Sequence, residues 1–194
     1  MGFYAGIDFG TSGARIAVIN TATDLLFEHG IRFGSATDWL TVWRAALLEL
    51  MASIPSAWRQ HLAAIAINGT SSTVLLCDET GQPITQPLLY HDDSGAAALE
   101  NLRQFFAQPQ FANATCKDTV LSATSSLVKL LWWQSQPFFP KARHLLHQAD
   151  WLAFLLHGQL GISDYHNSLK LGYDVHRLCY PAWMEALGIL PLLP

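Results

Sequence analysis

The sequence predicts an α/β protein in which helices pack on the faces of a mixed sheet. Apolar segments at 4–7 and 16–20, on either side of a Gly-Thr-Ser-Gly turn, predict two antiparallel strands joined as a tight hairpin. Aromatic and aliphatic residues recur at helical spacing between 39 and 51. The unbroken apolar run 63–67 is typical of a strand that is buried on both faces of a sheet.

The first half of the chain continues this pattern. A third strand at 25–33 would extend the hairpin into an antiparallel meander. Thr37 or Asp38 can cap the helix that follows, and Pro55 ends it. A further strand is expected at 73–77, where β-branched and aliphatic residues precede a polar turn.

The second half is richer in helix signals. Ser125 can cap a helix at 127–136, which ends before a proline. The remaining elements expected are an extended segment at 142–147 and helices at 149–156 (ended by Gly158), 165–171 (capped by Ser163) and 181–186 (ended by Gly188). No repeat or linker-like composition divides the chain, so a single domain is expected over 1–194.

Composition limits the classes of function. The 194 residues are 51% hydrophobic and 13% charged, and the formal net charge of −4 disfavours a nucleic-acid partner. Neither a signal peptide nor an apolar stretch long enough to cross a bilayer is found. Cys77, Cys116 and Cys179 lack metal-binding spacing, and the histidines form no zinc motif. We therefore expect a cytoplasmic protein with reduced thiols and no membrane partner.

The turn at 10–13 carries the clearest chemical signal. Gly10 and Gly13 allow backbone angles and a close approach that a side chain would block, and Thr11 and Ser12 add hydroxyl groups. Successive main-chain amides in such a turn can form an anion-binding concavity. Asp8 ends the first strand, and its carboxylate could hold a hydrated divalent cation. The pattern indicates a phosphate-and-metal site, and a plain hairpin whose small residues serve geometry explains it equally well.

Residues 8–15, Asp-Phe-Gly-Thr-Ser-Gly-Ala-Arg, resemble the phosphate-binding hairpin of the sugar kinase, actin and Hsp70 superfamily. Four later stretches, at 68–73, 90–93, 147–152 and 163–174, resemble stretches of the FGGY carbohydrate kinases and follow in the same order. The nearest likeness is to the D-ribulose/D-xylulose kinase group. The resemblance covers essentially the whole chain and implies a ribonuclease-H-like domain of the actin-like ATPase superfamily.

The resemblance also assigns roles to individual residues. Ser71 and Ser72 occupy positions that touch the sugar, and Asp92 would accept hydrogen bonds from sugar hydroxyls. Asp8 would lie beside both the sugar and the metal. The residues that would hold the transferring phosphate of ATP are Gly10, Thr11, Ser12 and Gly13.

Some positions depart from the family's pattern or have a simpler explanation. Asn68 stands where an aspartate is frequent, and His91 replaces the usual asparagine. Asp92 could instead cap a following helix, where the helix dipole favours acidic residues. Asp150 stands near a predicted helix start, where a capping role is the commoner one. The roles of His91 and Asp150 are therefore left open.

The family's enzymes transfer the γ-phosphoryl group of ATP to a sugar hydroxyl with the help of Mg²⁺. The resemblance therefore implies a kinase acting on a pentulose, either D-ribulose or D-xylulose. The family's catalytic aspartate and ATP-binding domain follow the point that corresponds to residue 194, so no catalytic base is assigned here. We expect an N-terminal sugar-binding domain that is inactive alone and works with the C-terminal domain of the same protein. The alternative is a stand-alone sugar- or partner-binding module that could form a homodimer through an apolar surface.

Overall fold

The computed structural model describes residues 2–194, which form two compact units. The first unit contains residues 2–70 and 152–158, and the second contains residues 71–151 and 159–194. The expectation of a single domain over the whole chain stays a prediction. Among residues 2–194, no helix combines the length and the apolar character that crossing a membrane requires.

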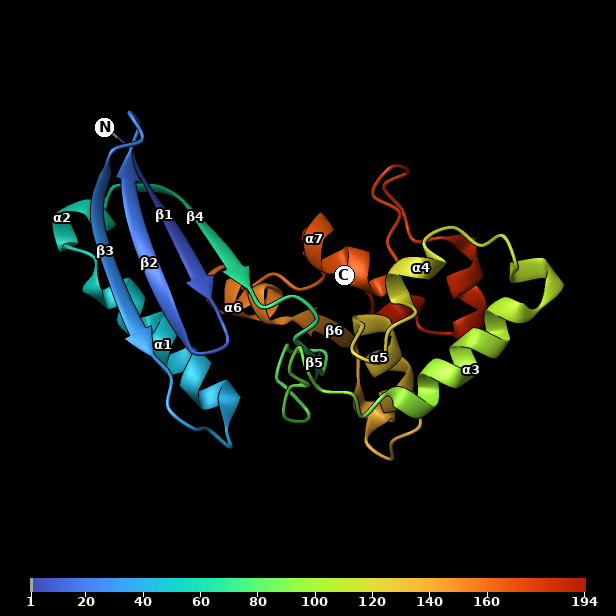
Figure 1. Ribbon diagram of the computed structural model, residues 1–194. Helices are drawn as coiled ribbons and strands as arrows, with labels where there is room; N and C mark the ends of the chain where they lie inside the picture. Colours follow the sequence, from blue (N-terminus) through green and yellow to red (C-terminus); the bar gives the residue numbers. More distant parts are fainter. Residues whose placement is uncertain (1) are drawn as a thin grey trace. The chain divides into compact units, whose positions relative to one another are not determined.

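The first unit is built on a four-stranded sheet (Figure 1). Its strands are β1 (Phe3–Phe9), β2 (Gly13–Asn20), β3 (Leu25–Arg32) and β4 (Leu62–Gly69), in the spatial order β3-β2-β1-β4. β2 pairs antiparallel with both β1 and β3, whereas β4 pairs parallel with β1. The predicted meander and the mixed sheet are therefore confirmed.

One face of this sheet packs against helix α1 (Trp39–Ser53), and the short helix α2 (Ser56–Arg59) follows it (Figure 1). Alternate residues of β1 and β2 are buried on that face, because successive side chains of a strand point to opposite faces. The buried side chains are Ala5, Ile7, Phe9, Ala14, Ile16 and Val18 from the strands and Trp43, Ala46, Leu47 and Leu50 from the helix. Asp38 caps α1 by accepting a hydrogen bond from the main-chain nitrogen of Thr41.

β4 contradicts one expectation. The run 63–67 does form a strand, but residues 63–66 are exposed, and 38% of the surface of Ile65 is accessible. Within residues 2–194, β4 is an edge strand whose one neighbour in the sheet is β1. The apolar run therefore predicted the strand correctly, but the predicted burial is wrong. An edge strand lacks a neighbouring strand on one side, so its side chains are more open to solvent.

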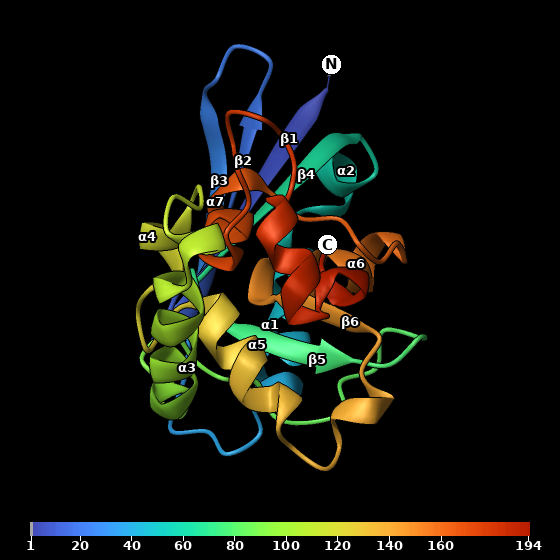
Figure 2. The ribbon, with the colours of Figure 1, turned by 90° about the vertical axis from the view of Figure 1, so that its right-hand side faces the viewer.

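The second unit combines a small sheet with helices. β5 (Val74–Cys77) and β6 (His144–His147) pair antiparallel in a sheet of their own, so the strand expected near 73–77 does not extend the larger sheet. Helix α3 (Ala96–Ala107), which the sequence suggested only through a possible cap at Asp92, lies beside α5 (Ser126–Gln134) (Figure 2). The other elements are α4 (Lys117–Val120), α6 (Gln148–His157), α7 (Tyr165–Ser168) and the 3₁₀ helices η1 (Pro109–Phe111), η2 (Phe139–Lys141), η3 (Leu169–Leu171), η4 (Ala182–Leu187) and η5 (Leu190–Leu192).

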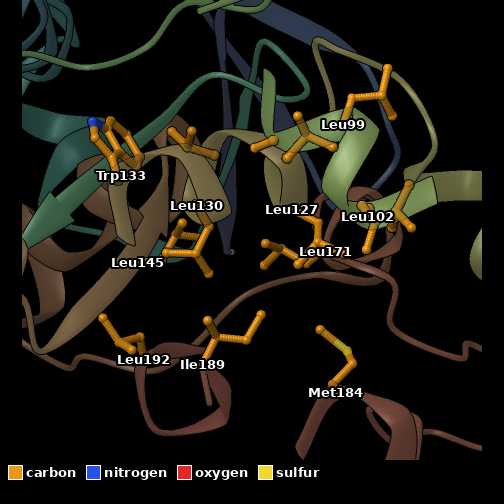
Figure 3. Packing of buried hydrophobic residues seen from close by; sticks show 14 of the residues in the cluster. Leu99, Leu102, Leu127, Leu130, Trp133, Leu145, Leu171, Met184, Ile189 and Leu192 are labelled. Atoms are coloured by element: carbon orange, nitrogen blue, oxygen red, sulfur yellow. The ribbon is translucent and has the colours of Figure 1, made fainter. Parts of the chain in front are cut away.

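The core of this unit is one cluster of aliphatic and aromatic side chains (Figure 3). Its members from α3, α5, β6, the 3₁₀ helices and the residue before η5 include Leu99, Leu102, Leu127, Leu130, Trp133, Leu145, Leu171, Met184, Ile189 and Leu192. Trp183 belongs to the same cluster and packs edge-on against Phe106, with the ring centroids 4.9 Å apart. The last helices of the chain are thus held by the same core as α5.

Most signals at the helix ends are confirmed. Ser125 caps α5 through its side chain, and Gly158 and Gly188 adopt left-handed backbone angles directly after α6 and η4. The expected cap of α7 is wrong, because Asp164 rather than Ser163 accepts the main-chain hydrogen bond from its first turn. The segment expected as a helix over 165–171 is split into α7 and η3, and that over 181–186 is a 3₁₀ helix.

The three thiols differ in burial, which predicts the order in which they react. Cys77 is buried in β5, and this burial raises the pKa of its thiol to about 12, whereas Cys179 is exposed. Because the thiolate is the reactive form, we expect a disulfide reagent at about pH 8 to modify Cys179 first and Cys77 only after denaturation. Timed labelling followed by mass spectrometry checks this order, and early labelling of Cys77 would contradict its burial.

Candidate functional site

The turn between β1 and β2 has a shape that depends on Gly13. The main-chain nitrogen of Gly10 donates a hydrogen bond of 2.9 Å to the carbonyl oxygen of Gly13 and closes the turn. A Cβ atom at position 13 would lie 2.4 Å from the carbonyl oxygen of Ile31, so β3 approaches too closely for a side chain. A Cβ atom at position 10 would meet nothing closer than 3.6 Å, and neither glycine has a left-handed angle. Close approach of the chain is therefore confirmed for Gly13, whereas no atom of the chain approaches Gly10 as closely.

Thr11 and Ser12 form the exposed tip of this turn. Their main-chain amides and their hydroxyl groups make no hydrogen bond to any of residues 2–194. An open cavity of about 880 Å³ borders the turn, and Asp8, Gly10 and Ser12 are among its lining residues. Unpaired amides beside such a cavity are suited to binding an anion such as a phosphate group.

The cavity extends over the sheet face opposite to α1, where charged side chains surround small ones. Asp8 pairs with Arg15, which in turn pairs with Gly30, so these three positions share this face. Arg15 and Arg32 line the cavity together with the acids Asp8 and Glu28, so it offers side chains of both charges. Neither arginine was singled out from the sequence. Arg15 could have been, because in a hairpin whose turn is closed by residues 10 and 13, residues 8 and 15 pair across the two strands.

Asn68 holds the carboxylate of Asp8. The two residues are register partners in β4 and β1, and Nδ2 of Asn68 donates a hydrogen bond of 3.0 Å to Oδ1 of Asp8. Oδ2 of Asp8 has no hydrogen-bond partner among residues 2–194. Mg²⁺ commonly takes one or two carboxylates together with water and phosphate oxygens, so this single open oxygen fits such an ion. Among residues 2–194, no group of three or more His, Cys, Asp or Glu side chains could hold a metal ion.

The loop with Ser71 and Ser72 lies in the second unit, directly before β5. The backbone of Ser72 has a φ angle of 62°, a left-handed conformation that is uncommon outside glycine. Oγ of Ser71 is buried and lacks a hydrogen-bond partner among residues 2–194. A buried hydroxyl group without a partner is costly, which is consistent with a site that a ligand completes.

The loop at 90–93 presents an aromatic ring and a carboxylate. Tyr90 is 46% exposed and meets the ring of His91 edge-on, with the centroids 4.9 Å apart. Oδ1 of Asp92 accepts a hydrogen bond from the main-chain nitrogen of Ser94, and Oδ2 has no partner among the described residues. Gly95 is the N-cap of α3 and no side chain caps that helix, so the alternative role of Asp92 as a helix cap is wrong.

Lys129 of α5 connects these two loops. It is fully buried, and its Nζ donates hydrogen bonds of 2.7 Å to the carbonyl oxygen of Ser72 and 2.5 Å to that of Leu89. Burial lowers the pKa of this amine to about 8, and the negative charge of Asp92 partly offsets that effect. Sequence reasoning overlooked Lys129, although a charged residue inside the apolar stretch 127–133 was a visible signal.

Asp150 has a structural position. Its Oδ2 accepts hydrogen bonds of 2.9 Å from the main-chain nitrogen of His147 and from Nδ1 of the same residue. Its Oδ1 accepts a third, also of 2.9 Å, from the hydroxyl group of Ser163. A carboxylate in the first turn of α6 that reaches back to the residue before the helix completes half of a capping box. The capping role considered for Asp150 is therefore confirmed.

Each unit gathers one set of the predicted site residues. The first unit brings Asp8, Gly10, Ser12 and Gly13 to one cavity, and Thr11 is not among its lining residues. In the second unit, Lys129 joins the loops that carry Ser72 and Asp92. The binding roles of all these residues stay predictions.

Solved structures with a similar fold include a xylulose kinase and a glycerol kinase. A xylulose kinase from Brucella ovis matches with a TM-score of 0.80 at 20% identity, over 99% of this chain and 42% of that one. Plasmodium falciparum glycerol kinase with ADP matches with a TM-score of 0.75 at 17% identity, over 100% of this chain and 42% of that one. The chain therefore has the actin-like ATPase fold, as its resemblance implied.

The family follows from the sequence. The model of the FGGY family of carbohydrate kinases, N-terminal domain, matches residues 3–191, so the chain belongs to this family. Xylulose kinase from Staphylococcus xylosus is 22% identical over 170 residues, and glycerol kinase from Herminiimonas arsenicoxydans is 26% identical over 219 residues. The first match covers 82% of this chain and 35% of that protein, and the second covers 99% and 42%. The chain thus spans well under half the length of these curated relatives.

Proposed function

We propose that this chain is the sugar-binding N-terminal part of an ATP-dependent kinase that phosphorylates a hydroxyl group of D-ribulose or D-xylulose. The observation that carries the proposal is the cavity in the first unit. There, Ser12, whose main-chain amide is unpaired, lines the same space as Arg15 and Asp8, and Asp8 has one carboxylate oxygen without a hydrogen-bond partner. Donors for a phosphate and one ligand for a cation are the groups that phosphoryl transfer requires.

The residues of the first unit would act by positioning and by charge. When bound, ATP would supply the phosphoryl group and Mg²⁺ would neutralise part of its charge. The amides of Thr11 and Ser12 would hold phosphate oxygens, and Arg15 would add a positive charge beside them. Asn68 would keep Oδ1 of Asp8 engaged, so that Oδ2 faces the ligand in one orientation.

The residues of the second unit would orient the sugar. Ser71 has a buried hydroxyl group without a partner, and Asp92 has a free carboxylate oxygen. Both are groups with which sugar hydroxyls form hydrogen bonds. The family resemblance to pentulose kinases supports a five-carbon ketose, and the xylulose kinases among the similar proteins agree with this class.

A binding measurement tests the sugar assignment. Calorimetric titration of the folded chain with D-ribulose and D-xylulose is expected to show a dissociation constant roughly in the millimolar range, as suits a cleft without its closing partner. Asp92→Asn keeps the oxygen that accepts from Ser94 and removes the charge, and we expect it to weaken binding about tenfold. Asp93→Asn changes an exposed neighbouring acid and serves as the matched control. Equal affinities in the two variants would contradict the role of Asp92.

We also expect the chain alone to be inactive. No residue between 2 and 194 is assigned as the base that takes the proton of the sugar hydroxyl. An assay of the purified 194-residue chain with ATP, Mg²⁺ and either pentulose should give no sugar phosphate above the enzyme-free control. Measurable turnover by the pure chain would mean that the catalytic base lies within it, and it would contradict the expectation that the chain alone is inactive.

A second candidate function is a stand-alone binding module. The exposed apolar edge strand β4 favours it, because an unpaired strand edge can pair with another chain. Sedimentation analysis separates the two ideas. A salt-insensitive homodimer would favour the module, and a monomer that gains affinity only with a C-terminal domain would favour the kinase.

A further inference from the structure

We infer that Lys129 is a positioning residue that fixes the arrangement of the two loops presenting Ser71, Ser72 and Asp92. The inference that these loops hold a sugar rests on the proposed function, whereas the two hydrogen bonds by which Lys129 holds the loops are observed in this chain. The side chain of Lys129 comes from α5, and it reaches carbonyl oxygens that lie 57 and 40 residues away in the sequence. One buried ammonium group thus ties together three segments that are distant in the chain.

The two loops are already joined at their base. The main-chain nitrogen of Val74 donates to the carbonyl oxygen of Leu88 at 3.0 Å, and that of Leu88 donates back at 2.9 Å. Lys129 adds a second attachment just beyond this bridge, at the carbonyl oxygens of Ser72 and Leu89. Removing Lys129 therefore leaves the base intact and frees the parts of the loops that carry the proposed ligand groups.

The backbone of Ser72 explains why a second attachment is useful. A non-glycine residue at a φ angle of 62° persists only where surrounding contacts hold it. The hydrogen bond from Lys129 holds the carbonyl group of this residue. A hydrogen bond from a charged donor in a buried setting is strong enough to offset such strain. Without it, Ser72 can relax toward an ordinary backbone conformation, which would turn the neighbouring hydroxyl groups away from their present directions.

Hydrogen exchange measures this attachment directly, without any ligand. The amide of Asp92 donates to the carbonyl oxygen of Leu89, which also accepts from Lys129. In Lys129→Met we expect the Asp92 amide to exchange about tenfold faster, because its acceptor is no longer held, and the Val74 amide to keep its protection. Lys117→Met removes another hydrogen bond from a lysine to a carbonyl oxygen, that of Ala112, and should leave both amides unchanged.

The result also separates this inference from the proposed function. Faster exchange at Asp92 together with a tenfold weaker pentulose affinity in Lys129→Met supports both. Faster exchange in a chain that binds no pentulose supports the attachment and overturns the proposed function. Unchanged exchange at Asp92 overturns the inference, whatever the sugar affinity.

The unmodified chain gives a second test, in case Lys129→Met fails to fold. The protons on the Nζ of a buried ammonium group held by two carbonyl oxygens should exchange slowly with water, so Lys129 should give a visible signal in a nitrogen-15 spectrum of the lysine side chains. Scalar couplings from that nitrogen to the carbonyl carbons of Ser72 and Leu89 would support the attachment. If the Nζ protons of Lys129 exchange with water as fast as those of exposed lysines, the inference is overturned.

Discussion

Gly13→Ala is expected to lower the free energy of unfolding by about 3 kcal/mol, a large effect for the addition of one methyl group. The new Cβ atom would lie 2.4 Å from the carbonyl oxygen of Ile31 and 3.4 Å from Cα of Arg32. Both are backbone atoms of β3, which pairs with β2 at this point, so neither can move aside without breaking the ladder. Chemical denaturation followed by circular dichroism measures the loss.

Gly10→Ala is the matched control for this prediction. Its Cβ atom would meet the carbonyl oxygen of Gly13 at 3.6 Å, an ordinary contact, and its backbone angle suits alanine. We expect a change in stability of less than about 1 kcal/mol. Equal stability of the two variants would show that the close approach of β3 to the turn does not determine the residue at position 13.

Asp150→Ala is expected to destabilise the chain by about 3 kcal/mol. The carboxylate is buried and accepts hydrogen bonds from the main chain of His147, from its imidazole ring and from Ser163. Removing it leaves the buried main-chain and imidazole donors of His147 without this acceptor, and the half-buried hydroxyl group of Ser163 also loses its bond. Thermal or urea unfolding measures the loss.

Asp164→Ala provides the comparison for Asp150. Asp164 is exposed and caps α7 by accepting from Asn167, so its loss should cost about 1 kcal/mol, the typical worth of a helix cap. Similar losses in the two variants would contradict the distinction between a buried acceptor of three hydrogen bonds and a surface cap. Loss of sugar binding in a stable, folded Asp150→Asn would contradict its purely structural role.

Much of the fold could be predicted because its signals are local. The strands around the turn at 10–13 and helix α1 follow from alternation and from helical spacing over a few residues. The errors arise where the outcome depends on distant neighbours. The burial of β4 depends on what lies beside it, and the tight packing of Gly13 depends on β3, which begins twelve residues later.

The candidate site divides in the same way. The turn and Asp8 were visible as a motif, and Arg15 could have been found from the pairing of residues across the turn. Asn68 stands where the family often has an aspartate, and in the structure it donates a hydrogen bond to Asp8. Lys129 could not be placed from sequence, because its acceptors lie on loops whose distance from α5 is set only by the folded second unit.

Residues of the second unit are expected to bind a pentulose. An NMR titration of the isotope-labelled chain with D-ribulose and D-xylulose can detect this binding residue by residue. The amide signals of residues 71–73 and 90–93 should shift together as the concentration of either sugar rises through the millimolar range. Unchanged signals from these residues in a folded chain, or shifts confined to other residues, would contradict it.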